Sequence, residues 1–218
     1  MLDILAIDGP SGVGKSSTAR RVAAELGWAY MDTGAMYRAA TLALMRAGAA
    51  PGEAGVLGSL GFEQLGGRFF LKGEDVSEEI RSREVTQKVS AVSADPSVRE
   101  ALVDVQRRMG RGGRWVVDGR DIGTVVFPQA VCKIFLVADP EARAHRRLLE
   151  LRSKGIGATF QEVLEDQARR DYLDSTREAG PLSKAEDAIE LDSGGLSLEE
   201  VVERILGIYR SRVAQTRP

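Results

Sequence analysis

A glycine-rich loop between an apolar run and a helical pattern constrains this chain more than any other feature. The run "LDILAID" is followed by "GPSGVGKSS" at residues 9–17 and then by "TARRVAAEL". The loop fits the spacing G-x-x-x-x-G-K-[ST], with Gly9, Gly14, Lys15 and Ser16 at the defining positions. Glycines let successive backbone N–H groups turn inward around an anion at the positive end of a helix. The pattern therefore predicts a phosphate-binding loop (P-loop).

Lysine and serine at the end of this loop indicate a nucleoside triphosphate. Lys15 is expected to reach the β and γ phosphates of ATP or GTP, and the Ser16 hydroxyl to coordinate Mg²⁺. A plain glycine turn capped by Ser11 or Ser16 is the structural alternative. The residues expected to contact ATP are Gly9, Pro10, Ser11, Gly12, Val13, Gly14, Lys15, Ser16 and Ser17.

Charge and composition restrict the partners. The 218 residues carry a net charge of −2, which argues against binding to polymeric DNA or RNA. No apolar run reaches membrane-spanning length, and the start "MLDILAID" does not resemble a signal peptide. The lone Cys132 cannot form an internal disulfide. We expect a monomeric, cytoplasmic protein without a membrane partner.

Apolar runs alternate with helical patterns along the chain. The expected strands are 3–7, 114–118, 132–138 and, more weakly, 187–191, and the expected helices are 15–26, 34–47, 96–109, 140–153, 160–174 and 198–213. This order predicts one α/β domain over residues 1–218, with a parallel sheet covered by helices on both faces. The interval from about 52 to 86 breaks the rhythm, and its run "GRFFLKGEDVS" indicates an inserted lobe with a hairpin or a small sheet of its own.

The nucleotide loop alone does not choose among a switch, a motor and a kinase. The guanine-reading tetrapeptide N-K-x-D does not occur, which weakens the GTPase interpretation, and a motor would need further domains. A small-molecule kinase needs a second anionic site. Arginines and acids follow the expected strands in "DTGAMYRA", "VVDGRDIGTVVFP" and "RRDYLDSTREAGPL", at the edge where α/β sheets bind ligands. Alternatively, the arginines of the last segment form a solvated face paired with Asp171 and Asp174.

These segments, together with "GPSGVGKS", resemble the bacterial cytidylate kinases, a branch of the nucleoside monophosphate kinases, in order and in spacing. The resemblance runs from the first strand to the last helix. It implies a P-loop NTPase core, a small lobe that binds the nucleoside monophosphate (NMP) at about 52–86, and a short lid at about 152–160, "RSKGIGATF". It also implies transfer of the γ-phosphoryl group of ATP to CMP or dCMP, with Mg²⁺.

The resemblance assigns the acceptor site residue by residue. Ser90, Arg99 and Asp121 match positions that contact cytosine. Arg170 and Asp174 match the ribose contacts, and Arg38, Arg120 and Arg177 match the arginines on the acceptor phosphate. Thr33, where the family also uses serine, and Tyr37 complete the substrate-binding residues. Ser16 replaces a glycine of some members and supplies a hydroxyl for Mg²⁺.

The chemistry is compatible with this assignment. The attacking group on CMP is already an oxyanion, so catalysis reduces to positioning and charge neutralisation. Arg143 and Arg147, at i,i+4, are expected as lid arginines over the transferring group, unless they form a solvated basic face. Asp118, at a strand end, is expected to orient Mg²⁺-bound water, unless it is an ordinary strand-end acid. A monophosphate kinase of other base preference and a non-catalytic nucleotide switch remain the alternatives.

Overall fold

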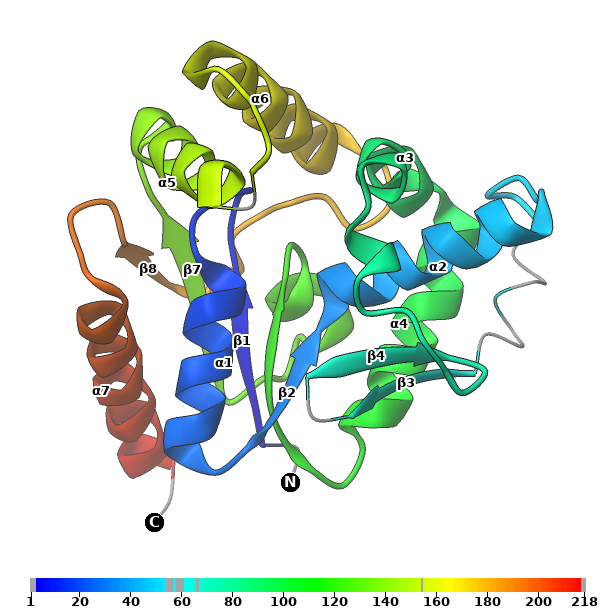
Figure 1. The fold of residues 1–218 in the computed structure, drawn as a ribbon. Coiled ribbons are helices and arrows are strands. Elements are labelled where there is room, and N and C mark those ends of the chain that lie inside the picture. Colours follow the sequence, from blue (N-terminus) through cyan, green and yellow to red (C-terminus); the bar gives the residue numbers. More distant parts are fainter. Residues whose placement is uncertain (1–2, 54–56, 58–60, 66, 154, 217–218) are drawn as a thin grey trace.

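A computed structural model describes residues 3–53, 57, 61–65, 67–153 and 155–216. Its centre is a parallel sheet of five strands in the order β2-β6-β1-β7-β8 (Figure 1). The strands are β1 (Asp3–Asp8), β2 (Ala29–Asp32), β6 (Arg114–Gly119), β7 (Cys132–Val137) and β8 (Ile189–Asp192). All four strands expected from the sequence are present, and the short apolar "WAYM" overlaps the edge strand β2. Because the strands are parallel, their carboxyl ends all lie at one edge of the sheet.

Seven helices are formed by the described residues. They are α1 (Lys15–Leu26), α2 (Thr33–Ala47), α3 (Arg83–Ala94), α4 (Pro96–Gly110), α5 (Pro140–Ser153), α6 (Phe160–Thr176) and α7 (Leu198–Thr216). The central strand β1 shows how they cover the sheet. Leu5 and Ile7 pack in one core with α1 and α7, whereas Ile4 and Ala6 pack in a second core with α2 and α4. The predicted α/β core with helices on both faces is confirmed.

The inserted lobe is a small antiparallel sheet beside α2 (Figure 1). Its strands are β3 (Phe62–Leu65), β4 (Arg68–Leu71) and β5 (Glu74–Asp75), and a 3₁₀ turn, η2, follows at Glu79–Arg81. The predicted hairpin in "GRFFLKGEDVS" is β4–β5. The strand β3 was not located in the sequence, because "FEQL" is short and half exposed. With it the lobe is a three-stranded sheet, which was the expected alternative to a hairpin. Parts of the predicted insertion, 54–56, 58–60 and 66, lie outside the described residues.

Two further boundaries differ from the prediction. Helix α3 begins at Arg83, capped by the Ser82 side chain, so the expected end of the insertion at about 86 falls inside a helix. The expected lid at 152–160 is the short connection between α5 and α6, where Thr159 and Glu162 form a capping box. Residue 154 of this lid is outside the described residues.

Two general expectations concern single features. Cys132 is buried in β7, as expected for a residue packed inside a strand. Among the described helices, none has the length and apolar character required to cross a bilayer.

Candidate active site

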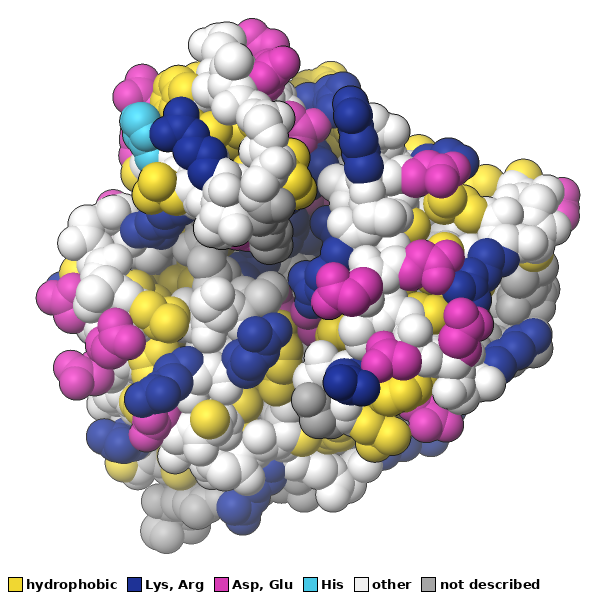
Figure 2. Space-filling model, viewed as in Figure 1, with side chains coloured by type: hydrophobic (Ala, Val, Ile, Leu, Met, Phe, Trp, Pro, Cys, Tyr) yellow, Lys and Arg dark blue, Asp and Glu magenta, His cyan; other side chains and the backbone are white. Residues whose placement is uncertain are grey.

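The carboxyl edge of the sheet opens into a cavity of about 850 Å³. The P-loop and α1 form one wall, α2 and α3 form the opposite wall, and α5 and α6 overhang the opening (Figures 1 and 2). Nine of the ten predicted substrate-binding residues line it: Thr33, Tyr37, Arg38, Ser90, Arg120, Asp121, Arg170, Asp174 and Arg177. The tenth, Arg99, lies directly behind Asp121. The topology therefore brings the predicted donor and acceptor residues into one cavity.

The P-loop is closely packed from behind. Gly9 adopts φ +148°, and a Cβ there would lie 2.2 Å from the carbonyl oxygen of Leu136. A Cβ on Gly12 would lie 2.2 Å from the Gln167 amide nitrogen on α6. Of the nine residues expected to contact ATP, the cavity is lined by Ser11, Gly12, Gly14, Lys15, Ser16 and Ser17. Only glycine fits at the two tight positions, since the loop backbone approaches β7 and α6 so closely.

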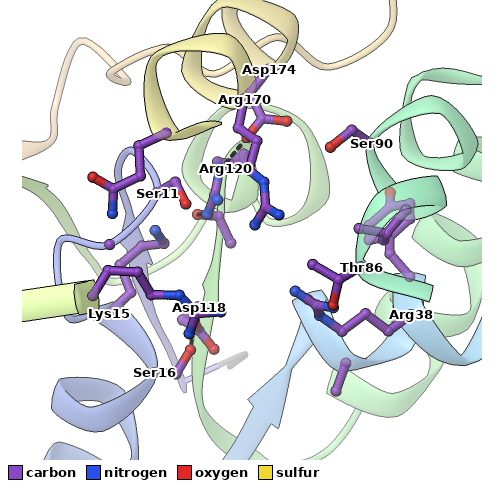
Figure 3. A pocket seen from close by; sticks show the side chains of 18 of the residues that line it. Ser11, Lys15, Ser16, Arg38, Thr86, Ser90, Asp118, Arg120, Arg170 and Asp174 are labelled. Carbon is purple, nitrogen blue, oxygen red and sulfur yellow. Dashed lines mark hydrogen bonds and ion pairs between the residues drawn. The ribbon is translucent and has the colours of Figure 1, made fainter. Parts of the chain in front are cut away.

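Lys15 is buried at the base of the cavity, and its Nζ donates a hydrogen bond to the Pro10 carbonyl at 2.6 Å (Figure 3). Burial, together with the neighbouring guanidinium of Arg120, lowers the pKa of Lys15 below its ordinary value. A phosphate placed beside the ammonium would oppose both effects. The lysine is thus poised to bind an anion in the cavity.

Ser16 and Asp118 meet where Mg²⁺ is expected. The Ser16 hydroxyl donates to one oxygen of Asp118 at 2.8 Å, and the Tyr30 hydroxyl donates to the other at 2.8 Å. Burial, and then the carboxylate of Asp32, raise the pKa of Asp118 above its usual range.

Among the described residues, no cluster of three or more His, Cys, Asp or Glu side chains could hold a metal ion. Mg²⁺ requires less, because it is commonly held by one or two carboxylates together with water and substrate phosphates. The buried Asp118 carboxylate and the Ser16 hydroxyl, two hard oxygen donors at the start of α1, fit this mode of binding.

A second charged cluster lies across the cavity from the P-loop. Arg99, on α4, donates to the Asp121 carboxylate, and both side chains are almost fully buried. The same guanidinium lies 5.5 Å from the ring centre of Tyr37 and donates to the Ser93 carbonyl. A Cβ on Gly180 would lie 2.3 Å from each partner of the pair, which explains a glycine at that point. The backbone at Gly180 therefore covers one side of the Arg99–Asp121 ion pair.

Arg120 and Arg177 converge on Asp174, a residue of α6. Arg120 Nε donates to Asp174 at 2.7 Å, and Arg177 lies 3.5 Å from the same carboxylate and 3.6 Å from Asp121 (Figure 3 shows the Arg120–Asp174 pair). Two buried polar atoms of this wall, the Tyr37 hydroxyl and Arg177 Nη2, form no hydrogen bond with any part of the protein that the structure describes. Buried polar atoms normally have partners, so these two point to a polar ligand.

The remaining acceptor residues form a basic cluster. Arg38 donates to the Thr86 hydroxyl at 2.8 Å, and Ser90 lies one helical turn further along α3 (Figure 3). Burial, with Arg170 and Arg81 nearby, lowers the pKa of Arg38 to about 10. Burial likewise lowers the pKa of Arg170. The guanidinium groups of Arg38, Arg81 and Arg170 repel one another across this part of the cavity, so they favour binding of an anion there.

The two expected lid arginines have different placements. Arg147 lines the cavity and pairs with Glu150 at 2.7 Å. Arg143 is buried outside the lining: its guanidinium donates to the carbonyls of Ser11 and Ala138 and to the Asp171 carboxylate. The shared face expected from i,i+4 spacing does not carry Arg143 into the cavity, since three oxygen acceptors behind the P-loop hold it.

Several cavity residues were missed by the sequence analysis: Tyr30, Asp32, Arg81, Arg146, Asp166 and Gln167 line or border the site. The sequence did hold a signal for Asp32, because this residue ends a strand directly before the predicted Thr33. Arg81 and Gln167 had no comparable signal, because only the folded chain brings them to the cavity.

A model of the "Cytidylate kinase" family matches residues 5–211. The chain belongs to the cytidylate kinase family. The chain is 51% identical over 214 residues to a cytidylate kinase of Mycobacterium leprae, covering 96% of each chain. It is 50% identical to one of Caldanaerobacter subterraneus, over 94% of each. The family resemblance of the four sequence segments is thereby confirmed.

Solved structures show the same fold at low identity. A shikimate kinase from Bacteroides thetaiotaomicron matches with a TM-score of 0.50 at 12% identity, covering 95% of this chain and 98% of the other. A gluconokinase from Sinorhizobium meliloti matches with a TM-score of 0.50 at 15% identity, covering 99% and 98%. These matches confirm the P-loop kinase fold and carry no information on the acceptor.

Proposed function

We propose that this chain transfers the γ-phosphoryl group of ATP to CMP and dCMP, producing the diphosphates. Membership of the cytidylate kinase family over residues 5–211 supports the reaction. The observation that carries it is a cavity with two facing charged walls, the P-loop on one side and a network of arginines and carboxylates on the other. A nucleotide switch needs the first wall alone.

The donor half binds phosphate through backbone amides and one lysine. The N–H groups at the start of α1 and the Lys15 ammonium would hold the β and γ phosphates. Ser16 and Asp118 would hold Mg²⁺, which neutralises charge on the phosphates when it is bound. Lys15 moves from its contact with Pro10 toward the phosphate in this proposal, because the anion restores the charge that burial disfavours.

The acceptor half orients CMP and neutralises its phosphate. Arg38, Arg120 and Arg177 would bind the phosphate, and Arg170 and Asp174 the ribose. Arg177 Nη2 supports this placement, since it is a buried donor that lies 3.6 Å from Asp121 but forms no hydrogen bond within the described residues. Arg147 lines the same cavity and would contribute to the charge on the transferring group.

Asp121 and Arg99 would select the base. Cytosine offers an amino donor at N4 and acceptors at N3 and O2, which match a carboxylate beside a guanidinium. Uracil reverses the polarity at position 4 and at N3, at a cost of about 1–3 kcal/mol for each mismatched contact. Ser90, on the cavity wall, would supply a further hydroxyl contact.

A coupled assay of ADP release tests the proposal. With ATP and Mg²⁺, we expect turnover with CMP and dCMP, at least about tenfold lower kcat/KM with UMP, and little ADP without an acceptor. Faster turnover of UMP, AMP or GMP would indicate a monophosphate kinase of other base preference. ADP release that does not depend on any monophosphate would contradict the kinase assignment. Monomeric state and cytoplasmic location stay predictions.

A further inference from the structure

Helices α5 and α6 contact the P-loop from behind, and a side chain of each helix binds the backbone of Ser11. The Ser11 N–H donates to Asp171 Oδ1 at 2.8 Å, and the Ser11 carbonyl accepts from Arg143 Nη1 at 2.8 Å. Both backbone groups of Ser11 are therefore engaged by side chains that lie far away in the sequence. Backbone contacts do not depend on the Ser11 side chain, so they fix the path of the loop itself.

The two side chains that hold Ser11 also hold each other. Arg143 Nη1 pairs with the second oxygen of Asp171, and Arg143 Nε donates to the Ala138 carbonyl at the end of β7. Arg143 keeps 8% of its side-chain surface and Asp171 keeps 19%. A buried charge pair with satisfied hydrogen bonds is rigid, and loss of one partner leaves the other uncompensated. Ser11, Arg143 and Asp171 thus form one unit, which we call the clasp.

The two side chains of the clasp lie outside the cavity. Ser11 lines the cavity, but neither Arg143 nor Asp171 does. The Asp171 carboxylate therefore does not occupy the place of a phosphate. Arg143 Nε and Nη1 donate to the Ala138 and Ser11 carbonyls and to Asp171, so these donors are not directed at a phosphate. From this position, Arg143 and Asp171 can support the P-loop and do not compete with ATP for its site.

Gln167 extends this support by one helical turn of α6. Its side chain is almost fully buried, donates to the Arg143 carbonyl, and lies so close to Gly12 that a Cβ there would be 2.2 Å from the amide nitrogen. Gln167 and Asp171 are four residues apart and share one face of the helix. That face of α6 contacts Ser11 and Gly12, the first two P-loop residues that line the cavity.

The same helix carries the acceptor contacts. Arg170 and Asp174 flank Asp171 on α6, and Asp174 holds Arg120 at 2.7 Å. A displacement of α6 would thus change both the P-loop and the acceptor wall. Helix α6 thus connects the two halves, because Asp171 contacts the P-loop and Asp174 contacts the acceptor wall.

We propose that Arg143 and Asp171 are positioning residues that hold the P-loop in its ATP-binding path by gripping the Ser11 backbone from α5 and α6. This inference rests on the proposed function, because it concerns the same ATP site. It differs from the sequence-based expectation for Arg143, which placed that arginine on the transferring phosphoryl group. The two ideas predict opposite effects of removing the Asp171 charge.

Binding of an unreactive ATP analogue with a β,γ-imido bridge, measured by calorimetry, separates them. In Asp171→Asn the Arg143 pair is lost, and the clasp predicts that the analogue's Kd rises by about tenfold while the Kd of CMP stays within about twofold. If Arg143 acts on phosphate directly, its release should leave the analogue's Kd unchanged or lower it. Either of those results overturns the clasp, as does an equal rise of both dissociation constants.

Two further variants keep the test decisive. Arg143→Lys retains the charge but cannot reach all three acceptors, so it should raise the Kd of the analogue to a similar degree. The Kd of the double variant should rise no further than that of either single variant. If Asp171→Asn fails to fold, Arg143→Lys takes its place as the test. If the effects of the two single variants on Kd add fully in the double variant, the clasp is contradicted. Glu165→Gln, an exposed change on α6 at a carboxylate that accepts a hydrogen bond from Gln161, is the matched control and should change neither Kd. Wild-type protein that binds CMP but no analogue would refute the proposed donor site, and the clasp with it.

Discussion

The two halves of the cavity are built on opposite principles. The donor half is one continuous stretch at residues 9–17, in which backbone geometry dominates. The acceptor half is assembled from side chains on α2, α3, α4, the segment after β6, and α6. The first half depends on glycines at tight positions, and the second depends on charged side chains that pair with one another.

This difference explains how each half would tolerate change. A backbone cradle presents the same N–H groups whatever the exposed side chains are, so only Lys15, Ser16 and the tight glycines are sensitive. A network of buried ion pairs has no such redundancy. Removing one partner leaves a buried charge uncompensated, which costs more than the pair contributes when intact. Substitutions in the acceptor half should therefore affect neighbours as well as the contact removed.

The largest expected effect is in the donor half. Lys15→Ala should lower kcat by about 100-fold or more, because the ammonium meets charge that develops on the transferring phosphoryl group. Steady-state kinetics with CMP, together with circular dichroism to verify folding, measure it. Near-normal turnover in a folded variant would refute the P-loop role of Lys15.

A smaller effect is expected for the ribose contact in the acceptor half. Asp174→Ala removes the partner of both Arg120 and Arg177, so kcat/KM should fall by about 30-fold for CMP and dCMP together. Both substrates keep the 3′-OH, which is why they should suffer equally. A loss confined to CMP would place Asp174 on the 2′-OH and would show that the network is less coupled than we infer.

Asp8 links the halves, since it ends β1 before the P-loop and accepts the N–H groups of Ile122 and Gly123 at 2.9 and 2.8 Å, just after Asp121. Burial raises the pKa of Asp8 to about 6. The folded protein thus binds this proton more tightly than the unfolded chain, and the free energy of unfolding falls as pH rises from about 4 to about 6.

Asp8→Asn lacks this titration. The stability difference, wild type minus variant, should decrease by about 2 kcal/mol between pH 4.5 and pH 7. Urea unfolding of both proteins at the two pH values measures it. A difference that stays constant with pH would mean that Asp8 is not a buried titrating link.

The sequence predicted the donor half better than the acceptor half for a physical reason. A P-loop is a local motif, so its spacing, its strand and its helix all lie within 26 residues. The acceptor residues were named through the family resemblance, and the pairing of Arg99 with Asp121 or of Arg120 with Asp174 depends on how α4 and α6 pack. Helical spacing placed Arg143 and Arg147 on one face, but it could not show that Ala138 after β7, Ser11 of the P-loop and Asp171 of α6 offer Arg143 three acceptors.

The central claim is that the Asp121–Arg99 pair in the acceptor half selects cytosine. The ratio of kcat/KM for CMP to that for UMP, in wild type and in Asp121→Asn, tests it most directly. Asparagine keeps the shape of the side chain but can direct an amide N–H at O4 of uracil, so the ratio should fall by at least about tenfold. Asp174→Asn is the matched control and should leave the ratio unchanged. If Asp121→Asn lowers both activities equally, Asp121 only holds Arg177 and Arg99 in place, and base selection lies elsewhere.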